Sequence, residues 1–127
     1  MNILLLDDNQ HRIAFFQNGL KNHRLVVCRH AKAAMKTLSD VQFDIIFLDH
    51  DLDDAPNEPD EENSGSEVAR FIVGHEIDCE CIILHSENRR GRDSMERILG
   101  KCQTIPYSKL KKMGFHAILK MAVPKQI

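Results

Sequence analysis

Aspartates gather directly after two apolar runs of the sequence. Asp7 and Asp8 follow the first run, and Asp49 and Asp51 follow the run Ile-Ile-Phe-Leu. Carboxylates brought close together repel one another unless a cation lies among them. Mg²⁺ is a natural partner, because it prefers oxygen ligands and is often held by one or two carboxylates with water and a substrate phosphate. We therefore predict a divalent metal site on these four aspartates, with Mg²⁺ preferred over Mn²⁺. Aspartates after strands also cap helices, and that alternative stays open for Asp8.

Two histidines accompany these carboxylates. His50 separates Asp49 from Asp51, and an extended strand would turn its side chain away from the face that the two aspartates share. His85 ends another apolar run. A histidine suits proton transfer near neutral pH because its free pKa lies there. We predict His50, His85 and Asp49 as catalytic residues, and structural roles for the other histidines, which are His11, His23, His30, His75 and His116.

A second polar segment, HSENRRGRDSMERIL, spans residues 85–99. We expect a helix to begin near residues 91–93 and to leave Arg89 in the preceding loop. Backbone N–H groups at a helix start favour anions, and arginine adds bidentate contacts to phosphate. The sequence therefore predicts Ser86, Asn88 and Arg92 as ligands of a phosphate.

An acidic segment, residues 53–64, carries six carboxylates and two prolines. We interpret it as a surface insertion, because its composition is too polar to pack. It is either a solvated loop or a flap that closes over the site. Arg89 and Arg90 have an alternative role here, since they are suited to pair with its carboxylates.

The elements that must position these residues alternate along the chain. Short runs rich in Ile, Val, Leu and Phe predict strands buried on both faces, at 2–6, 24–28, 43–49, 80–85 and, more weakly, 103–107. Segments with helical spacing of apolar residues follow each strand. This alternation predicts an α/β, flavodoxin-like, doubly wound parallel sheet of five strands in the order 2-1-3-4-5. Ligand sites in such sheets lie at the carboxyl ends of the strands, here between strands 1 and 3.

Size and composition limit the class of protein. A chain of 127 residues is expected to form one domain, and a net charge of -2 gives no general attraction to nucleic acid or to an anionic membrane. The N-terminal apolar run is too short for a signal peptide, and no run reaches the ~20 apolar residues of a membrane helix. We therefore expect a cytoplasmic protein with reduced cysteines.

These residues resemble the receiver domain of response regulators over nearly the whole chain. Asp7 and Asp8 match the acidic pair that binds metal in that family, and Asp49 matches its phospho-acceptor. Ser86 matches the switch Ser or Thr, and Lys109 is a loose match to the lysine after strand 5. The chain departs from receivers in having His50 in place of an apolar residue, the acidic insertion, and Lys-Leu in place of Lys-Pro.

The departures resemble a narrower group, the receiver-like domains described as cyclic-phosphate-processing. Its signatures are Leu-Asp-His-Asp-Leu, here Leu48 to Leu52, and His-Ser-x-Asn-Pro-x-Gly-Arg-x-Asn-Met, here His85 to Met95. Arg89 replaces the proline of the second signature, and Ser94 replaces its second asparagine. The resemblance implies a cyclic nucleotide or another cyclic phosphate as ligand in nucleotide signalling.

Two functions of different class follow. The first is an enzyme in which a divalent metal activates water against a cyclic phosphate. The second is a signalling module, in which Asp49 accepts a phosphoryl group or the domain only senses a nucleotide. A module without an output domain would need a protein partner, which the sequence does not identify.

Overall fold

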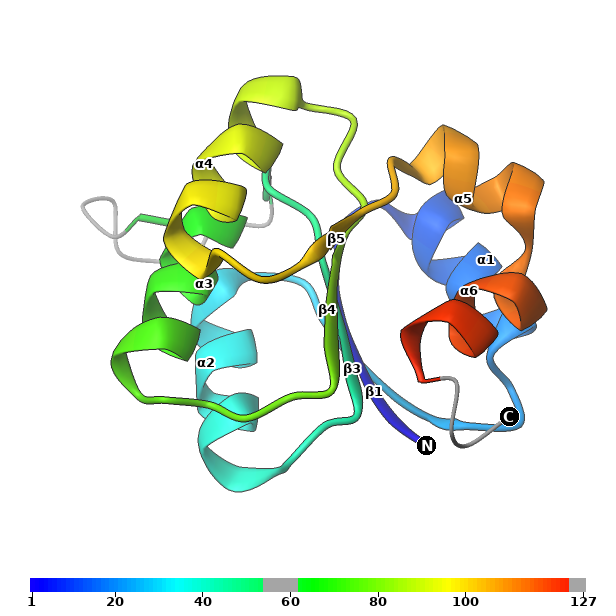
Figure 1. Cartoon of the computed structure of the whole chain (residues 1–127), viewed down its shortest axis with the longest axis horizontal. Coiled ribbons are helices and arrows are strands. Elements are labelled where there is room, and N and C mark those ends of the chain that lie inside the picture. The colour runs from blue at the N-terminus through cyan, green and yellow to red at the C-terminus, as the bar shows by residue number, and fades with distance from the viewer. Residues whose placement is uncertain (54–61, 124–127) are drawn as a thin grey trace.

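A computed structural model describes residues 1–53 and 62–123 of the chain. Its centre is a sheet of five parallel strands in the order β2-β1-β3-β4-β5, which confirms the predicted fold and strand order (Figure 1). The strands are β1 (Asn2–Leu6), β2 (Arg24–Cys28), β3 (Ile45–Leu48), β4 (Cys81–Leu84) and β5 (Gln103–Thr104).

Helices cover both faces of the sheet. In Figure 1, α2, α3 and α4 lie on one side, and α1, α5 and α6 lie on the other. The helices are α1 (Gln10–Gly19), α2 (Ala31–Asp40), α3 (Gly65–Gly74), α4 (Arg89–Leu99), α5 (Tyr107–Met113) and α6 (Phe115–Ala122). None of these helices is long and apolar enough to cross a membrane.

Alternate residues of β1 show why the strands read as continuous apolar runs. Leu4 and Leu6 belong to the core cluster under α2, α3 and α4, whereas Ile3 and Leu5 belong to the cluster on the opposite face. All four side chains are fully buried, and each contributes about 1.5–3 kcal/mol when removed from water. A strand buried on both faces has no polar alternation, so its sequence is apolar throughout.

Side-chain caps fix where the helices begin. The Asn9 side chain accepts a hydrogen bond from the Arg12 backbone N–H at 3.0 Å, and the Asn88 side chain accepts one from the Gly91 N–H at 3.2 Å. The predicted start of α4 near residues 91–93 is therefore wrong. The helix begins at Arg89, because Asn88 provides the cap oxygen that the first turn needs.

The C-terminal part also differs from the sequence prediction. The fifth strand has two residues instead of the expected 103–107, because Pro106 precedes α5 and the Tyr107 N–H bonds to the His85 carbonyl. The helical pattern that follows is divided at Gly114 into α5 and α6. Gly114 has φ +81°, a conformation that glycine adopts without steric cost.

Strand register brings three polar residues to one level at the carboxyl edge. Leu6 pairs with Leu48, and Leu48 pairs with Leu84. The ladder continues for one residue, since the Asp49 N–H bonds to the Leu6 carbonyl at 3.0 Å and the His85 N–H bonds to the Leu48 carbonyl at 3.1 Å. Asp7, Asp49 and His85 therefore begin side by side, on the central strands.

Most of the acidic segment, residues 54–61, lies outside the described residues, so the flap interpretation stays a prediction. The two described ends of the segment lie together. Asp51 forms an isolated antiparallel bridge with Ser64, and the Asn63 side-chain amide donates to the Leu52 carbonyl at 3.0 Å. The chain therefore leaves and returns to the sheet at the same edge, next to Asp49.

Candidate functional site

The cluster at the carboxyl edge has Asp7, Asp49 and His85 at its centre. One ligand atom from each of the three side chains lies within 4.8 Å of the others, and all three residues are buried. Asp7 and His85 are fully inaccessible to solvent, and Asp49 is 5% exposed. Two carboxylates that lie this close together and are excluded from solvent need a positive charge beside them.

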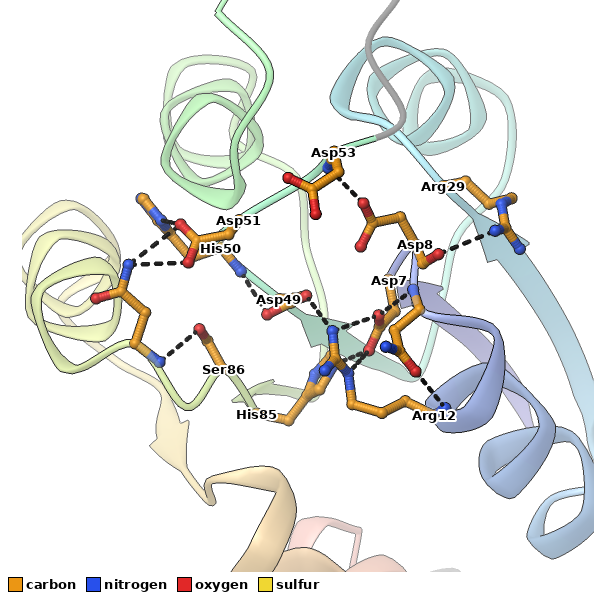
Figure 2. A network of polar contacts seen from close by, with 12 residues as sticks. Asp7, Asp8, Arg12, Arg29, Asp49, His50, Asp51, Asp53, His85 and Ser86 are labelled. Atoms are coloured by element: carbon orange, nitrogen blue, oxygen red, sulfur yellow. Dashed lines mark hydrogen bonds and ion pairs between the residues drawn. The ribbon is translucent and has the colours of Figure 1, made fainter.

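Arg12 supplies that charge (Figure 2). Its Nε donates to Asp7 Oδ2 at 2.9 Å, and its Nη2 donates to Asp7 Oδ1 at 3.0 Å. The same Nη2 also reaches Asp49 Oδ2 at 3.0 Å. The guanidinium thus makes a bidentate contact with Asp7 and bridges it to Asp49. Sequence reasoning missed Arg12. The available signal was its place in the first turn of α1, which starts at this edge directly after Asp7 and Asp8.

His85 is the third residue of the cluster and contacts Asp7. Its Nε2 bonds to Asp7 Oδ2 at 2.8 Å, while its Nδ1 is buried without a partner among the described residues. The ring packs against Phe16 and Phe47, with centroid distances of 5.2 and 6.3 Å. Because the Asp7 carboxylate can only accept, we assign a proton to His85 Nε2 in this hydrogen bond. His85 therefore orients Asp7.

The pKa values of the two buried carboxylates are shifted in opposite directions. Burial alone would raise the pKa of Asp7, but hydrogen bonds from His85 and Arg12 lower it from 3.8 to about 2. Burial raises the pKa of Asp49, and the neighbouring charge of Asp7 adds to the increase, which His85 and Arg12 only partly offset. Asp7 is therefore the anchored anion of the site, and Asp49 is the carboxylate whose charge is not fully compensated.

His50 lies on the wall of the site in a chain of hydrogen bonds. Its Nδ1 bonds to Asp51 Oδ1 at 2.9 Å and its Nε2 bonds to Ser66 Oγ at 3.0 Å. Ser66 Oγ in turn lies 2.8 Å from Ser94 Oγ on α4. Gly91 lies against the ring, since a Cβ at position 91 would be 2.6 Å from His50 Nδ1. The His50 ring is therefore fixed between β3, α3 and α4.

The alternation that we expected beyond Asp49 does not continue, because β3 ends at Leu48. Asp49 turns inward to Arg12. The Asp51 side chain is 63% exposed, and both of its oxygens lie 3.1 Å from the Asn88 side-chain nitrogen. The hydrogen bond from His50 lowers the pKa of Asp51. Asp51 is thus paired with His50 and Asn88, outside the cluster that Asp7 and Asp49 form.

A cavity of about 370 Å³ opens above the cluster. Its lining brings together five of the predicted site residues with four that were not predicted, and consists of Asp8, Asn9, Arg12, Asp49, Asp51, Asp53, Ser86, Glu87 and Asn88. Asp8 Oδ2 accepts a hydrogen bond from the Asp53 N–H at the rim. Ser86 Oγ accepts one from the Asn88 N–H at 3.1 Å.

Four residues named from the sequence lie outside this lining, which are Asp7, His50, His85 and Arg92. Arg92 donates from Nη1 to the Ser86 carbonyl at 2.8 Å, so it holds the loop after β4 in place. Lys109 is exposed on α5, and the residue that follows β5 and precedes a proline is the buried Ile105. The lysine expected after the fifth strand thus has no counterpart at that strand end, and the arginine inside the cavity is Arg12.

Comparison with known proteins decides the family. Residues 2–101 match the family model of the cyclic-phosphate processing receiver domain. The chain belongs to this family. No curated protein sequence matches the chain.

Solved structures similar to this cyclic-phosphate-processing receiver are receiver domains. The signal receiver domain of an HD domain-containing protein from Pseudomonas fluorescens has a TM-score of 0.76 at 16% identity, covering 98% of this chain and 95% of that one. TrrA from Thermotoga maritima, in complex with Mg²⁺-BeF, has 0.70 at 18%, covering 96% and 98%. The receiver domain of a Pseudomonas aeruginosa sensor histidine kinase, with a magnesium ion in its active site cleft, has 0.74 at 17%, covering 98% of each chain. At these identities the likeness shows the fold.

The donor atoms of this cyclic-phosphate-processing receiver fit a hard divalent cation. Asp7 and Asp49 offer carboxylate oxygens, the ligands that such an ion prefers, within 4.8 Å of each other, and the Arg12 guanidinium already places a positive charge between them. His85, whose Nε2 bonds to Asp7 Oδ2 at 2.8 Å, is suited to orient a ligating carboxylate. Asp8 lies in the lining above and is within the same cavity.

Proposed function

We propose that this cyclic-phosphate-processing receiver binds a cyclic nucleotide or a related cyclic phosphate, together with a divalent cation, in the cavity at the carboxyl edge, and that it hydrolyses the cyclic ester. The observation that carries the proposal is one cavity in which buried carboxylates, a guanidinium and the polar start of α4 converge. Carboxylates suit the cation, and the guanidinium and the polar loop suit the phosphate.

Asp7, Asp49 and Asp8 would hold the cation, with Mg²⁺ preferred and Mn²⁺ as an alternative. A divalent cation in this place supplies Lewis-acid polarisation of a phosphate oxygen. On the opposite wall, the Ser86 hydroxyl and the Asn88 amide are donors that face the same cavity. They would orient the phosphate, and Arg92 would support them through the Ser86 carbonyl.

His50 and Asp51 would accept the proton of the attacking water. Asp51 lines the cavity and His50 is bound to it at 2.9 Å, so the pair would hold this proton and return it to the ester oxygen that leaves the phosphorus. Ser66 holds the far side of the imidazole ring and keeps its orientation. His85 is fully buried, so we assign it the positioning of Asp7.

A second candidate is phosphoryl transfer to Asp49, as in response-regulator receivers. The position of Asp49 after the central strand favours it, and the similar TrrA structure contains Mg²⁺-BeF. Three features weigh against it, because Asp49 is almost fully buried, its carboxylate is engaged by Arg12, and its pKa is raised. A nucleophilic carboxylate needs access and a charged state.

The experiment that separates the two is a ligand matrix on the purified protein. Thermal unfolding is followed with Mg²⁺ or Mn²⁺ against a panel of cyclic mono- and dinucleotides, and separately against beryllofluoride. A ligand that binds only the folded state raises stability by RT ln(1 + [L]/Kd). Chromatography of the same mixtures then detects linear products.

We expect stabilisation by a cyclic nucleotide that requires the metal, and its conversion to the linear nucleotide. Asp49→Asn should abolish both effects, whereas Asp40→Asn, an exposed carboxylate at the end of α2, should leave them unchanged. If the whole panel stays intact and unbound while beryllofluoride binds with Mg²⁺, the phospho-acceptor function replaces our proposal.

A further inference from the structure

The Arg12 guanidinium contacts two buried carboxylates but is itself partly exposed to solvent. The Arg12 side chain is 26% exposed, whereas the carboxylates that it contacts are 0% and 7% exposed. We propose that Arg12 neutralises Asp7 and Asp49 in the metal-free protein, that it leaves Asp49 when a divalent cation binds, and that it then binds the phosphate of the ligand. The inference rests on the proposed function, since it assigns a metal and a phosphate to the same cavity.

The first step follows from geometry. The ligand atoms of Asp7, Asp49 and His85 lie within 4.8 Å of one another. Through Nε and Nη2 the guanidinium already bonds to three of the four carboxylate oxygens of Asp7 and Asp49. A divalent ion requires the same oxygens at about 2.1 Å, whereas a guanidinium takes them at about 2.8 Å. Both cations cannot use one set of oxygens, so binding of one requires movement of the other.

The second step follows from charge. Without a second cation, removal of Arg12 would leave Asp7 and Asp49 buried and facing each other, which is costly. Arg12 therefore stabilises the folded state of the metal-free protein. After a divalent ion has taken over that neutralisation, the guanidinium becomes surplus positive charge at the floor of the cavity, and a phosphate is the group that compensates it.

The third step concerns where Arg12 can go. The Tyr107 ring lies 5.9 Å from the guanidinium carbon, and Glu87 lies in the same lining. The hydrogen bond from the Ser108 N–H is the main cause of the lowered pKa of Glu87, and the charge of Arg12 contributes to this lowering. The aromatic face and the nearby carboxylate are partners that a long side chain reaches by rotating about its own bonds. Movement of Arg12 thus needs no change in the backbone.

The test measures metal and inorganic phosphate separately, without any nucleotide. Calorimetric titration with Mn²⁺ compares the wild-type protein with Arg12→Gln and with the control Arg29→Gln. Arg29 lies at the same edge but bonds to the Asp8 carbonyl and to Gln10, so its removal changes the local charge by the same amount. Inorganic phosphate is then titrated into each protein saturated with Mg²⁺.

We expect opposite effects from Arg12→Gln: Mn²⁺ binds about tenfold more tightly or better, and inorganic phosphate binds about tenfold more weakly or worse. Arg29→Gln should change each affinity by less than about threefold. An Arg12 that only supports the fold would weaken both. Equal or weaker Mn²⁺ binding by Arg12→Gln overturns the inference, as does unchanged phosphate binding.

A measurement on the wild-type protein removes the dependence on a variant that folds. The Nε–H of Arg12 donates to a buried oxygen and should give a protected resonance in ¹H–¹⁵N NMR spectra. Addition of Mg²⁺ should shift this resonance and accelerate its exchange with water. A resonance that stays unchanged at metal saturation refutes displacement. If no cyclic nucleotide of the panel binds or reacts, the proposed reaction is refuted. The displacement of Arg12 by metal is still tested, because this measurement contains no nucleotide.

Discussion

Asp7 and Asp49 provide a sharp test of the electrostatics of the site. Both are buried aspartates at the same sheet edge, yet the pKa of Asp7 is lowered and the pKa of Asp49 is raised. We expect the isosteric neutral substitutions to act in opposite directions in metal-free protein. Asp7→Asn should destabilise the fold, and Asp49→Asn should leave its stability equal or higher at pH 7.

The magnitude for Asp7 follows from its pKa. A fall from 3.8 to about 2 corresponds to about 2 kcal/mol at about 1.36 kcal/mol per pKa unit. Between these two pH values the unfolded chain binds the proton and the folded chain does not, so the stability due to Asp7 rises with pH. It is complete above about pH 4 and is lost as the pH falls through about 2. Asp49 contributes in the opposite direction, since its ionisation is less favourable in the folded state.

The assay is urea unfolding followed by circular dichroism, with chelator present, at pH 7 and at pH 3. Asp40→Asn serves as the control, because this exposed carboxylate ends α2 away from the site. Its change should stay within about 0.5 kcal/mol. Equal losses of unfolding free energy for Asp7→Asn and Asp49→Asn, or a larger loss for Asp49→Asn, would refute the charge assignment.

Three further substitutions, the first with a matched control, probe the packing around the site by the same urea assay. Gly91→Ala places a Cβ against the His50 ring and should cost about 1–3 kcal/mol, whereas Gly74→Ala, with no neighbour within 4 Å of the new Cβ at the end of α3, should cost nothing or stabilise slightly. Asn88→Ala removes a helix cap and should cost about 1 kcal/mol, with faster amide exchange in the first turn of α4; unchanged exchange would contradict the capping role. Ser66→Ala should cost about 1–3 kcal/mol by leaving His50 Nε2 without its partner, and an unchanged midpoint would show that this bond is not needed.

The sheet could be predicted because burial on both faces leaves a strong local signal. Each central strand is a run of apolar residues; the predicted range of β1 equals the observed one, and those of β3 and β4 differ by one or two residues at the ends. Asp7, Asp49 and His85 were found for the same reason, since each directly follows such a run. The fifth strand lies at the sheet edge and pairs over only two residues, so its signal was weak and its predicted length was wrong.

Arg12 could not be found in that way. Its role depends on the angle at which α1 leaves the sheet edge, and the apolar spacing of that helix carries no information about a polar residue in its first turn. The start of α4 was different, because Asn88 is a strong capping residue. The arginines after it are unfavourable at a helix start, and the cap outweighs them.

The carboxylates of the cavity bear on the speed of binding. Its lining holds Asp8, Asp49, Asp51, Asp53 and Glu87 against the single arginine Arg12 among the lining residues. An anionic nucleotide that approaches this mouth is slowed, and a divalent cation is accelerated, by the same field. Nucleotide association in metal-free buffer should therefore become faster as ionic strength rises, the reverse of ordinary electrostatic steering. For the proposed ligands we therefore expect an order of binding, with the cation first and the anion second.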